Sequence, residues 1–89
     1  MKLLRNKQYQ KKEIKFFKKH PNLISKYEKV LKKLQNDPFD ESLKTHKLKG
    51  DLKEFYACSL DYQYRIILNI VIIDDVIYLI DIGTHNEVY

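Results

Sequence analysis

The sequence has one cysteine, two glycines, two prolines and no tryptophan among its 89 residues. A single cysteine cannot form an internal disulfide, which suits a reducing compartment. No segment has the roughly 18 consecutive apolar residues of a membrane span, and the first residues, MKLLRNKQYQ, lack the apolar core of a signal peptide. We therefore expect a cytoplasmic protein with no membrane partner.

Several familiar catalytic motifs are also missing. The sequence has no glycine-rich phosphate loop, no G-x-S-x-G nucleophile elbow and no His or Cys spacing typical of zinc sites. We expect neither a metal site nor a small-molecule cofactor. Cys58 lies in the apolar run FYACSL, which favours a small buried side chain over a nucleophile.

Basic residues are almost absent from the last third of the chain. Of the 17 Lys and Arg residues, 16 lie in residues 1–53, and Arg65 is the only other one. The formal charge is +10 over residues 1–53 and −5 over residues 54–89. A basic segment of this size fits a polyanionic partner such as nucleic acid, although lysines also commonly do no more than solvate helices.

The N-terminal half has two helical patterns. Length and a hydrophobic content of 44% indicate one globular domain over residues 1–89. KLLR at the start predicts a short edge strand, and helices are expected over 7–20 and from Pro21 to residue 36. The first apolar stripe comprises Tyr9, Phe16, Phe17 and, as a further candidate, Ile14. The second comprises Leu23, Tyr27, Val30, Leu31 and Leu34.

The C-terminal half has the composition of β-structure. Residues 38–53 are polar and are expected to form a connecting loop. Strands are predicted over 55–60, 64–72 and 76–83, with a turn at the two aspartates 74–75. The resulting order is β-α-α-β-β-β. It predicts an α+β fold in which the helical hairpin packs on one face of a small, mainly antiparallel, twisted sheet.

Side-chain alternation gives the strand at 64–72 two different faces. The set expected to face the helices is Tyr64, Ile66, Leu68 and Ile70. Arg65 then lies on the opposite, open face. Because a guanidinium is always charged and is costly to bury alone, Arg65 is expected to have a partner or a function there.

Histidines and tyrosines supply the other candidates. His20 precedes Pro21 at a helix break, which favours a role at the helix end. His46 lies in the polar loop and, taken alone, would be a solvated residue. His85 follows the last strand just after Gly83, and such strand ends often carry functional groups. Tyrosines on the open face of the sheet could stack on nucleic-acid bases.

Three motifs occur in order in this half of the chain. They are His-x-Leu-x-Gly at 46–50, Tyr-Arg-Ile-Ile at 64–67 and Gly-Thr-His at 83–85 with Tyr89 four residues later. With the stretches HKLKGDLKEFYACSLDYQYRIIL and LIDIGTHNEVY around them, the chain resembles the RelE/ParE superfamily of bacterial type II toxins, most closely its YafQ-like branch. The resemblance covers essentially the whole chain. It implies a RelE-like fold and a cognate antitoxin as partner.

RelE-like members are ribosome-dependent endoribonucleases that cut mRNA, so the resemblance implies a metal-independent endoribonuclease with mRNA on the ribosome and ribosomal RNA as partners. In that reaction a 2′-hydroxyl attacks the scissile phosphate. The implied catalytic residues are Arg65, facing the phosphate, and His46 and His85, as base and acid in either order. Further RNA contacts are implied for Lys47, Lys49, Lys53, Tyr64 and Tyr89. Ribosome contacts are expected from Lys11, Lys12, Lys15, Lys18 and Lys19.

The site also departs from the YafQ pattern. That pattern has a histidine at the position of Ser59 and an aspartate at that of Gln63, and it lacks an arginine at that of Arg65. Glu54 and Asp61 therefore stay open as alternative bases. Two other functions are weighed: a ParE-like inhibitor of DNA gyrase without nuclease activity, and a catalytically inactive relic that only binds its antitoxin. The joint presence of two loop histidines and the strand arginine favours the nuclease.

Overall fold

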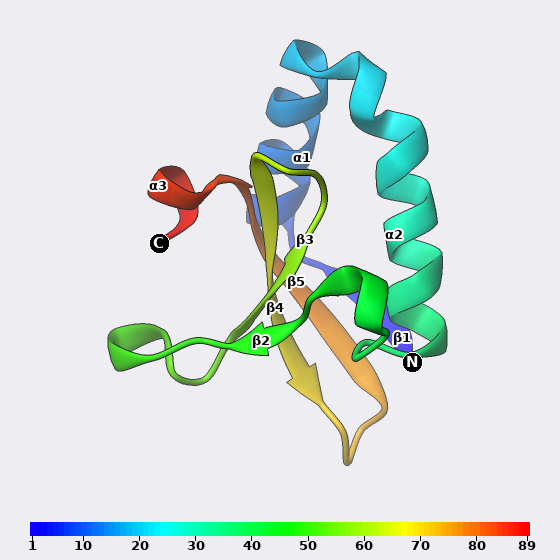
Figure 1. The fold of residues 1–89 in the computed structure, drawn as a ribbon, viewed down its shortest axis with the longest axis vertical. Helices are drawn as coiled ribbons and strands as arrows, with labels where there is room; N and C mark the ends of the chain where they lie inside the picture. The colour runs from blue at the N-terminus through cyan, green and yellow to red at the C-terminus, as the bar shows by residue number, and fades with distance from the viewer.

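The computed structural model describes residues 1–89 as a helical hairpin on a five-stranded sheet (Figure 1). The elements in chain order are β1 (Lys2–Arg5), α1 (Lys7–Lys19), η1 (Pro21–Leu23), α2 (Ile24–Asn36), η2 (Glu41–Leu43), β2 (His46–Lys47), η3 (Gly50–Leu52), β3 (Tyr56–Ser59), β4 (Tyr64–Val71), β5 (Val76–Thr84) and α3 (His85–Val88). The predicted α+β fold is confirmed. None of the helices has the length and apolar character that crossing a membrane requires.

The sheet has the order β1-β5-β4-β3-β2. Only β1 runs parallel to its neighbour, β5, while the other three pairs are antiparallel. Figure 1 shows α2 on one side of the sheet, whereas α3 and the segment that follows β2 extend on the other. The two long helices therefore cover only one face of the sheet, and the other face is bordered by α3 and by the segment after β2.

The two long helices lie where the sequence predicts, except that the expected first turn of the second helix is the 3-10 turn η1 and α2 begins at Ile24. The Asn6 side chain caps α1 by accepting a hydrogen bond from the backbone N–H of Tyr9, at 2.7 Å. His20 ends this helix, as expected, and its ring packs against Phe16. The expected stripe on α2 is buried except for a half-buried Leu31. Ile14 is a correction: its side chain is 59% exposed and lies outside the core.

The core lies between the helices and one face of β4 and β5. Ile66, Leu68 and Ile70 belong to it, and Tyr64 packs at its border, which confirms the predicted alternation. A register shift occurs between Ile67 and Leu68 because β5 has one extra residue there. Leu79 and Ile82 therefore both face the core, although strict alternation would place them on opposite faces.

The predicted loop over 38–53 is wrong in part. It contains two short 3-10 turns and the two-residue strand β2, which pairs with β3. Leu43 is buried and anchors the segment to the core. Two polar strand residues are too few to give a recognisable alternation, so nothing in the sequence marks β2 as a strand.

Candidate active site

Two of the three predicted catalytic side chains lie on the open face, the face of the sheet opposite the two long helices. Arg65 on β4 pairs with Ser59 on β3 and with Gly83 on β5. His46 on β2 pairs with Ala57, which in turn pairs with Ile67 on β4. Because directly paired residues share a face, His46 and Arg65 project to the same side. Two strand spacings and two residues along β4 separate their Cα positions by about 12 Å.

Arg65 is half-buried and bonds to the turn between β3 and β4. Its Nη1 donates to the carbonyl oxygens of Asp61 at 2.8 Å, Tyr62 at 3.2 Å and Tyr64 at 3.0 Å. These contacts hold the guanidinium at the start of β4. The Nε and Nη2 groups make no hydrogen bond within the protein. Two donors in one plane thus stay free for an anion such as a phosphate.

His85 is held by a capped helical turn. It is the first residue of α3, and Thr84 caps this helix by accepting from the Glu87 N–H while the Glu87 carboxylate accepts from the Thr84 N–H. These hydrogen bonds lower the pKa of the Glu87 carboxyl. The exposed His85 ring contacts Tyr89 one turn later, with ring centroids 4.2 Å apart. The ring is therefore held on a capped turn while the residue stays exposed.

Tyr89 connects α3 with the segment after β2. A hollow of about 350 Å³ is lined by Tyr89 and by Leu48, Lys49, Asp51 and Leu52. Partial burial raises the pKa of the Tyr89 hydroxyl, and the nearby Arg65 guanidinium acts in the opposite direction. The structure therefore brings Arg65, His85, Tyr89 and Lys49 together around one part of the open face.

His46 is exposed at the edge of the sheet. Its Nδ1 lies 3.1 Å from the carbonyl oxygen of Lys44. A carbonyl only accepts hydrogen bonds, so Nδ1 carries the proton in the neutral ring and Nε2 presents its lone pair. Lys44 adopts the left-handed conformation, with φ of 52°, where it ends η2. This backbone conformation places the Lys44 carbonyl within hydrogen-bond distance of His46 Nδ1.

Two predicted RNA contacts lie away from this face. The Tyr64 ring packs between Phe16 and His20, at 5.1 Å and 4.8 Å between centroids, on the helix side of the sheet. It is therefore a border residue of the core, not a platform for a base. Lys47 pairs with Tyr56 and, by alternation, points away from the side of His46. Lys53 is exposed at the end of η3 but does not line the hollow at Tyr89.

The α1 lysines divide into two groups. Lys12, Lys15 and Lys19 line a groove of about 170 Å³ that also includes Glu87 of α3. Lys12 bonds to Asp81 at 3.4 Å. Lys11 and Lys18 are exposed and do not line this groove. Three of the five predicted ribosome contacts thus lie next to the helix that carries His85.

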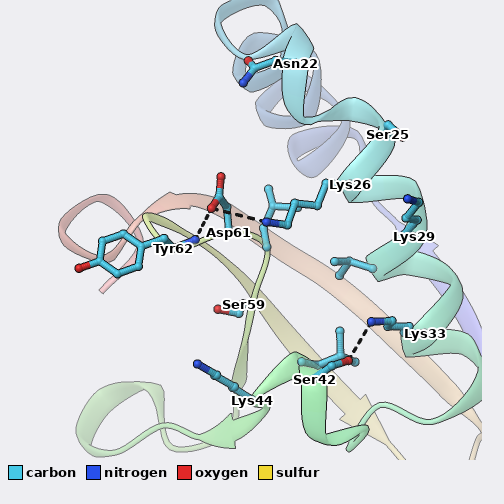
Figure 2. Close-up of a pocket in the computed structure, with 13 residues that line it drawn as sticks. Asn22, Ser25, Lys26, Lys29, Lys33, Ser42, Lys44, Ser59, Asp61 and Tyr62 are labelled. Carbon is cyan, nitrogen blue, oxygen red and sulfur yellow. Dashed lines mark hydrogen bonds and ion pairs between the residues drawn. The ribbon is translucent and has the colours of Figure 1, made fainter.

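The alternative bases occupy different surroundings. Glu54 is exposed in the turn before β3. The Asp61 carboxylate bonds to Lys26 of α2, at 3.7 Å (Figure 2). Only the backbone carbonyl of Asp61 contacts Arg65. This carboxylate lines a cleft at the edge of β3 that the sequence interpretation missed. The available signal was the spacing of Lys26, Lys29 and Lys33, which places them on one face of α2.

Neither the cysteine nor a metal cluster adds to the site. Cys58 is fully buried, and burial raises the pKa of its thiol to about 12. This confirms the expected buried side chain, since such a thiol is a poor nucleophile. No three His, Cys, Asp or Glu side chains lie close enough together to hold a metal ion.

Comparisons with known proteins agree with this architecture. A family model described as the bacterial toxin YafQ of type II toxin-antitoxin systems matches residues 1–89. A metal-bound toxin from Helicobacter pylori has 26% sequence identity and a TM-score of 0.80, with 100% of this chain and 99% of that chain covered. YafQ from E. coli has 18% identity and a TM-score of 0.80, with 98% and 96% covered.

A further similar structure is an assembly. The E. coli DinJ-YafQ toxin-antitoxin complex matches with 20% identity and a TM-score of 0.77, covering 98% of this chain and 94% of that chain. No curated protein sequence matches significantly. The match of the family model over the whole chain decides the assignment, and the five-stranded sheet with its helical hairpin agrees with it. The chain belongs to the YafQ family of bacterial toxins of type II toxin-antitoxin systems.

Proposed function

We propose that this toxin is an endoribonuclease that cleaves mRNA on the ribosome. The observation that carries the proposal is the position of Arg65, whose two free donors lie on the open face that also bears His46 and borders Tyr89. A planar pair of donors suits the extra negative charge that a phosphate acquires when it is attacked. The segment after β2 belongs to the basic part of the chain and brings Lys49 to the hollow at Tyr89.

The two histidines supply the proton transfers. His46 accepts the proton of the 2′-hydroxyl at Nε2, because Nδ1 already donates to the Lys44 carbonyl. The 2′-oxygen then attacks the adjacent phosphorus, and the bond from phosphorus to the 5′-oxygen breaks. Protonated His85 gives its proton to that leaving oxygen. The products are a 2′,3′-cyclic phosphate and a free 5′-hydroxyl, so the proton balance closes once the two histidines exchange protons with water.

Tyr89 and the cap of α3 orient the substrate and His85. The Tyr89 ring contacts His85 edge to face and lines the hollow at Leu48. An aromatic ring there stacks on a base whatever its identity. The scheme assigns no step to a metal ion, because the 2′-hydroxyl is itself the nucleophile.

A cognate antitoxin is the proposed protein partner. YafQ is bound to DinJ in the solved E. coli complex, and YoeB is bound to YefM in the one from Staphylococcus aureus. Both relatives share the fold of this chain, with TM-scores of 0.77 and 0.74. An acidic segment that covers the open face would block the same donors that the RNA needs.

Mapping of mRNA cuts tests the nuclease directly. Purified protein is incubated with mRNA, alone and on programmed ribosomes, and the cuts are located by primer extension. We expect cuts on ribosomes only, their loss in His85→Ala, and their retention in Asn86→Ala, which alters the neighbouring exposed residue of α3. Absence of cuts in every setting would contradict the proposal, and a DNA supercoiling assay would then separate a gyrase inhibitor from an inactive relic.

A further inference from the structure

The largest hollow of the molecule is a basic cleft between α2 and the edge of β3, with a volume of about 750 Å³ (Figure 2). It exists because β2 pairs with β3 only at Tyr56 and Ala57, which leaves the rest of this edge uncovered. One carboxylate, that of Asp61, faces four lysines, so the net charge of the lining is +3. These lysines are Lys26, Lys29, Lys33 and Lys44.

Most of this positive charge is not neutralised within the protein. Lys26 bonds to Asp61 at 3.7 Å. Lys33 donates to the neutral hydroxyl of Ser42 at 2.9 Å. Lys29 and Lys44 take part in none of the four ion pairs of the structure. A concave surface with an excess of free ammonium groups attracts an anion.

The arrangement suits a single nucleic-acid strand. Lys26, Lys29 and Lys33 follow one face of α2 over seven residues, which corresponds to about 10 Å along the axis. That length covers about three phosphates of a stacked strand. Tyr62 lies at the rim of the cleft and is 93% exposed. A basic groove with an aromatic ring beside it is the usual design of a surface for single-stranded nucleic acid.

The cleft and the proposed active site lie on the two sides of the turn between β3 and β4. Ser59 lines the cleft and is also the strand partner of Arg65. The turn that forms the rim, at Asp61 and Tyr62, supplies carbonyl oxygens that accept hydrogen bonds from Arg65. A strand held at Arg65 thus reaches the cleft across a single turn of the chain.

We propose that this cleft binds the sugar-phosphate backbone of the RNA strand that flanks the cleaved nucleotide, with Tyr62 stacking on one of its bases. The inference rests on the proposed function for the identity of the strand. It adds a binding site remote from the chemistry, on the far side of the turn between β3 and β4. An acidic peptide is the competing occupant, and the test below separates the two.

Fluorescence anisotropy with a short, labelled, unstructured RNA measures the binding without cleavage. All proteins carry His85→Ala, so that the RNA stays intact. The test variant combines Lys29→Gln and Lys33→Gln, and the matched control combines Lys7→Gln and Lys32→Gln, two exposed lysines outside the cleft. Both lower the net charge equally. Circular dichroism and thermal unfolding verify that each variant is folded.

We expect the test variant to bind about tenfold more weakly and to lower the slope of log affinity against log salt by about 1.4, since each lost phosphate contact removes about 0.7. The control should change the affinity far less. Tyr62→Ala should weaken binding by about tenfold, whereas Tyr78→Ala, at another exposed tyrosine, should have no such effect. Equal losses in both lysine variants would overturn the inference.

The competing occupant has its own outcome. If a polyglutamate peptide binds the control protein but not the Lys29 and Lys33 variant, while RNA binds both equally, the cleft is a peptide site and the inference is wrong. Failure of the nuclease proposal would appear separately, as absent cuts on ribosomes with RNA binding still dependent on the cleft. The nuclease proposal and the proposed RNA-binding cleft are therefore tested by different measurements.

Discussion

Replacement of Arg65 should separate the structural and catalytic roles of its guanidinium. The Nη1 contacts to the carbonyls of Asp61 and Tyr62 in the turn and of Tyr64 at the start of β4 are charge-assisted hydrogen bonds on a half-buried side chain. Such bonds contribute about 1.5–3 kcal/mol when buried, and partial exposure places this case near the lower value. For a domain of this size, about 1.5 kcal/mol corresponds to a fall in Tm of about 6–12 °C. Arg65→Gln should show this loss.

The catalytic loss should be larger than the loss of stability. The free Nε and Nη2 groups are the donors assigned to the phosphate, and removal of one preorganised donor typically lowers a rate by about 10²–10³. Arg65→Lys keeps the charge but loses the planar pair of donors, so it should still be slow. A purely structural arginine would instead lower Tm and leave the rate of the folded protein intact.

Single-turnover cleavage on programmed ribosomes provides the decisive readout. It is run at a temperature at which thermal unfolding shows each variant to be fully folded. Gln63→Ala, an exposed residue of the same turn, serves as the control and should match the wild type in rate and Tm. A cleavage rate for Arg65→Gln within about twofold of the wild type would refute the role of Arg65 in stabilising the transition state.

Five further outcomes are expected. Tyr9→Phe should lower the free energy of unfolding by about 1 kcal/mol, because the buried Tyr9 hydroxyl bonds to the Tyr27 hydroxyl at 2.7 Å. Glu13→Gln should lower it by about 2 kcal/mol, since Glu13 accepts hydrogen bonds from both Tyr27 and Arg5. Urea unfolding measures both changes, with Glu28→Gln as the control. The folded Cys58 thiol has a pKa of about 12 against an ordinary value of 9.0, so stability should fall as pH rises between these values, and Cys58→Ala should flatten that fall in urea titrations. Thr84→Ala should remove the cap of α3 and slow cleavage at least about tenfold, with almost no change in Tm if α3 unfolds locally. Cleavage should persist in phenanthroline, which chelates transition metals and leaves ribosomal magnesium in place, and its loss would show a metal requirement.

The main helices and strands follow from strong patterns in the sequence. The stripe on α2 repeats every three or four residues, and β4 alternates between core and open face, so both elements and the side of Arg65 are predictable. The apolar residues of these two elements are also the ones that fill the core, so the local pattern and the tertiary packing favour the same structure. Tyr64 shows the same point, because alternation alone places it on the helix side, where its ring is found.

Features that depend on pairing between strands cannot be predicted from such sequence patterns. The strand β2 exists only because β3 offers an edge to His46 and Lys47, and the extra residue of β5 changes which side chains face the core. The hydrogen bond between His46 Nδ1 and the Lys44 carbonyl depends on the left-handed conformation of Lys44, which the sequence does not predict. By contrast, Thr84-His85-Asn86-Glu87 carries the spacing of a capping box, so the helical turn at His85 was predictable.

The parallel pairing of β1 with β5 has a consequence for how this protein comes into being. Lys2 pairs with Val76 and Arg5 with Leu79, so β1 is synthesised well before the strand with which it pairs. Contacts this distant in sequence close slowly, after local helices have formed. A growing chain therefore carries its lysine-rich hairpin before it has a finished sheet, and His85 and Tyr89 are added only after β5. The nascent toxin is basic well before its catalytic face is assembled.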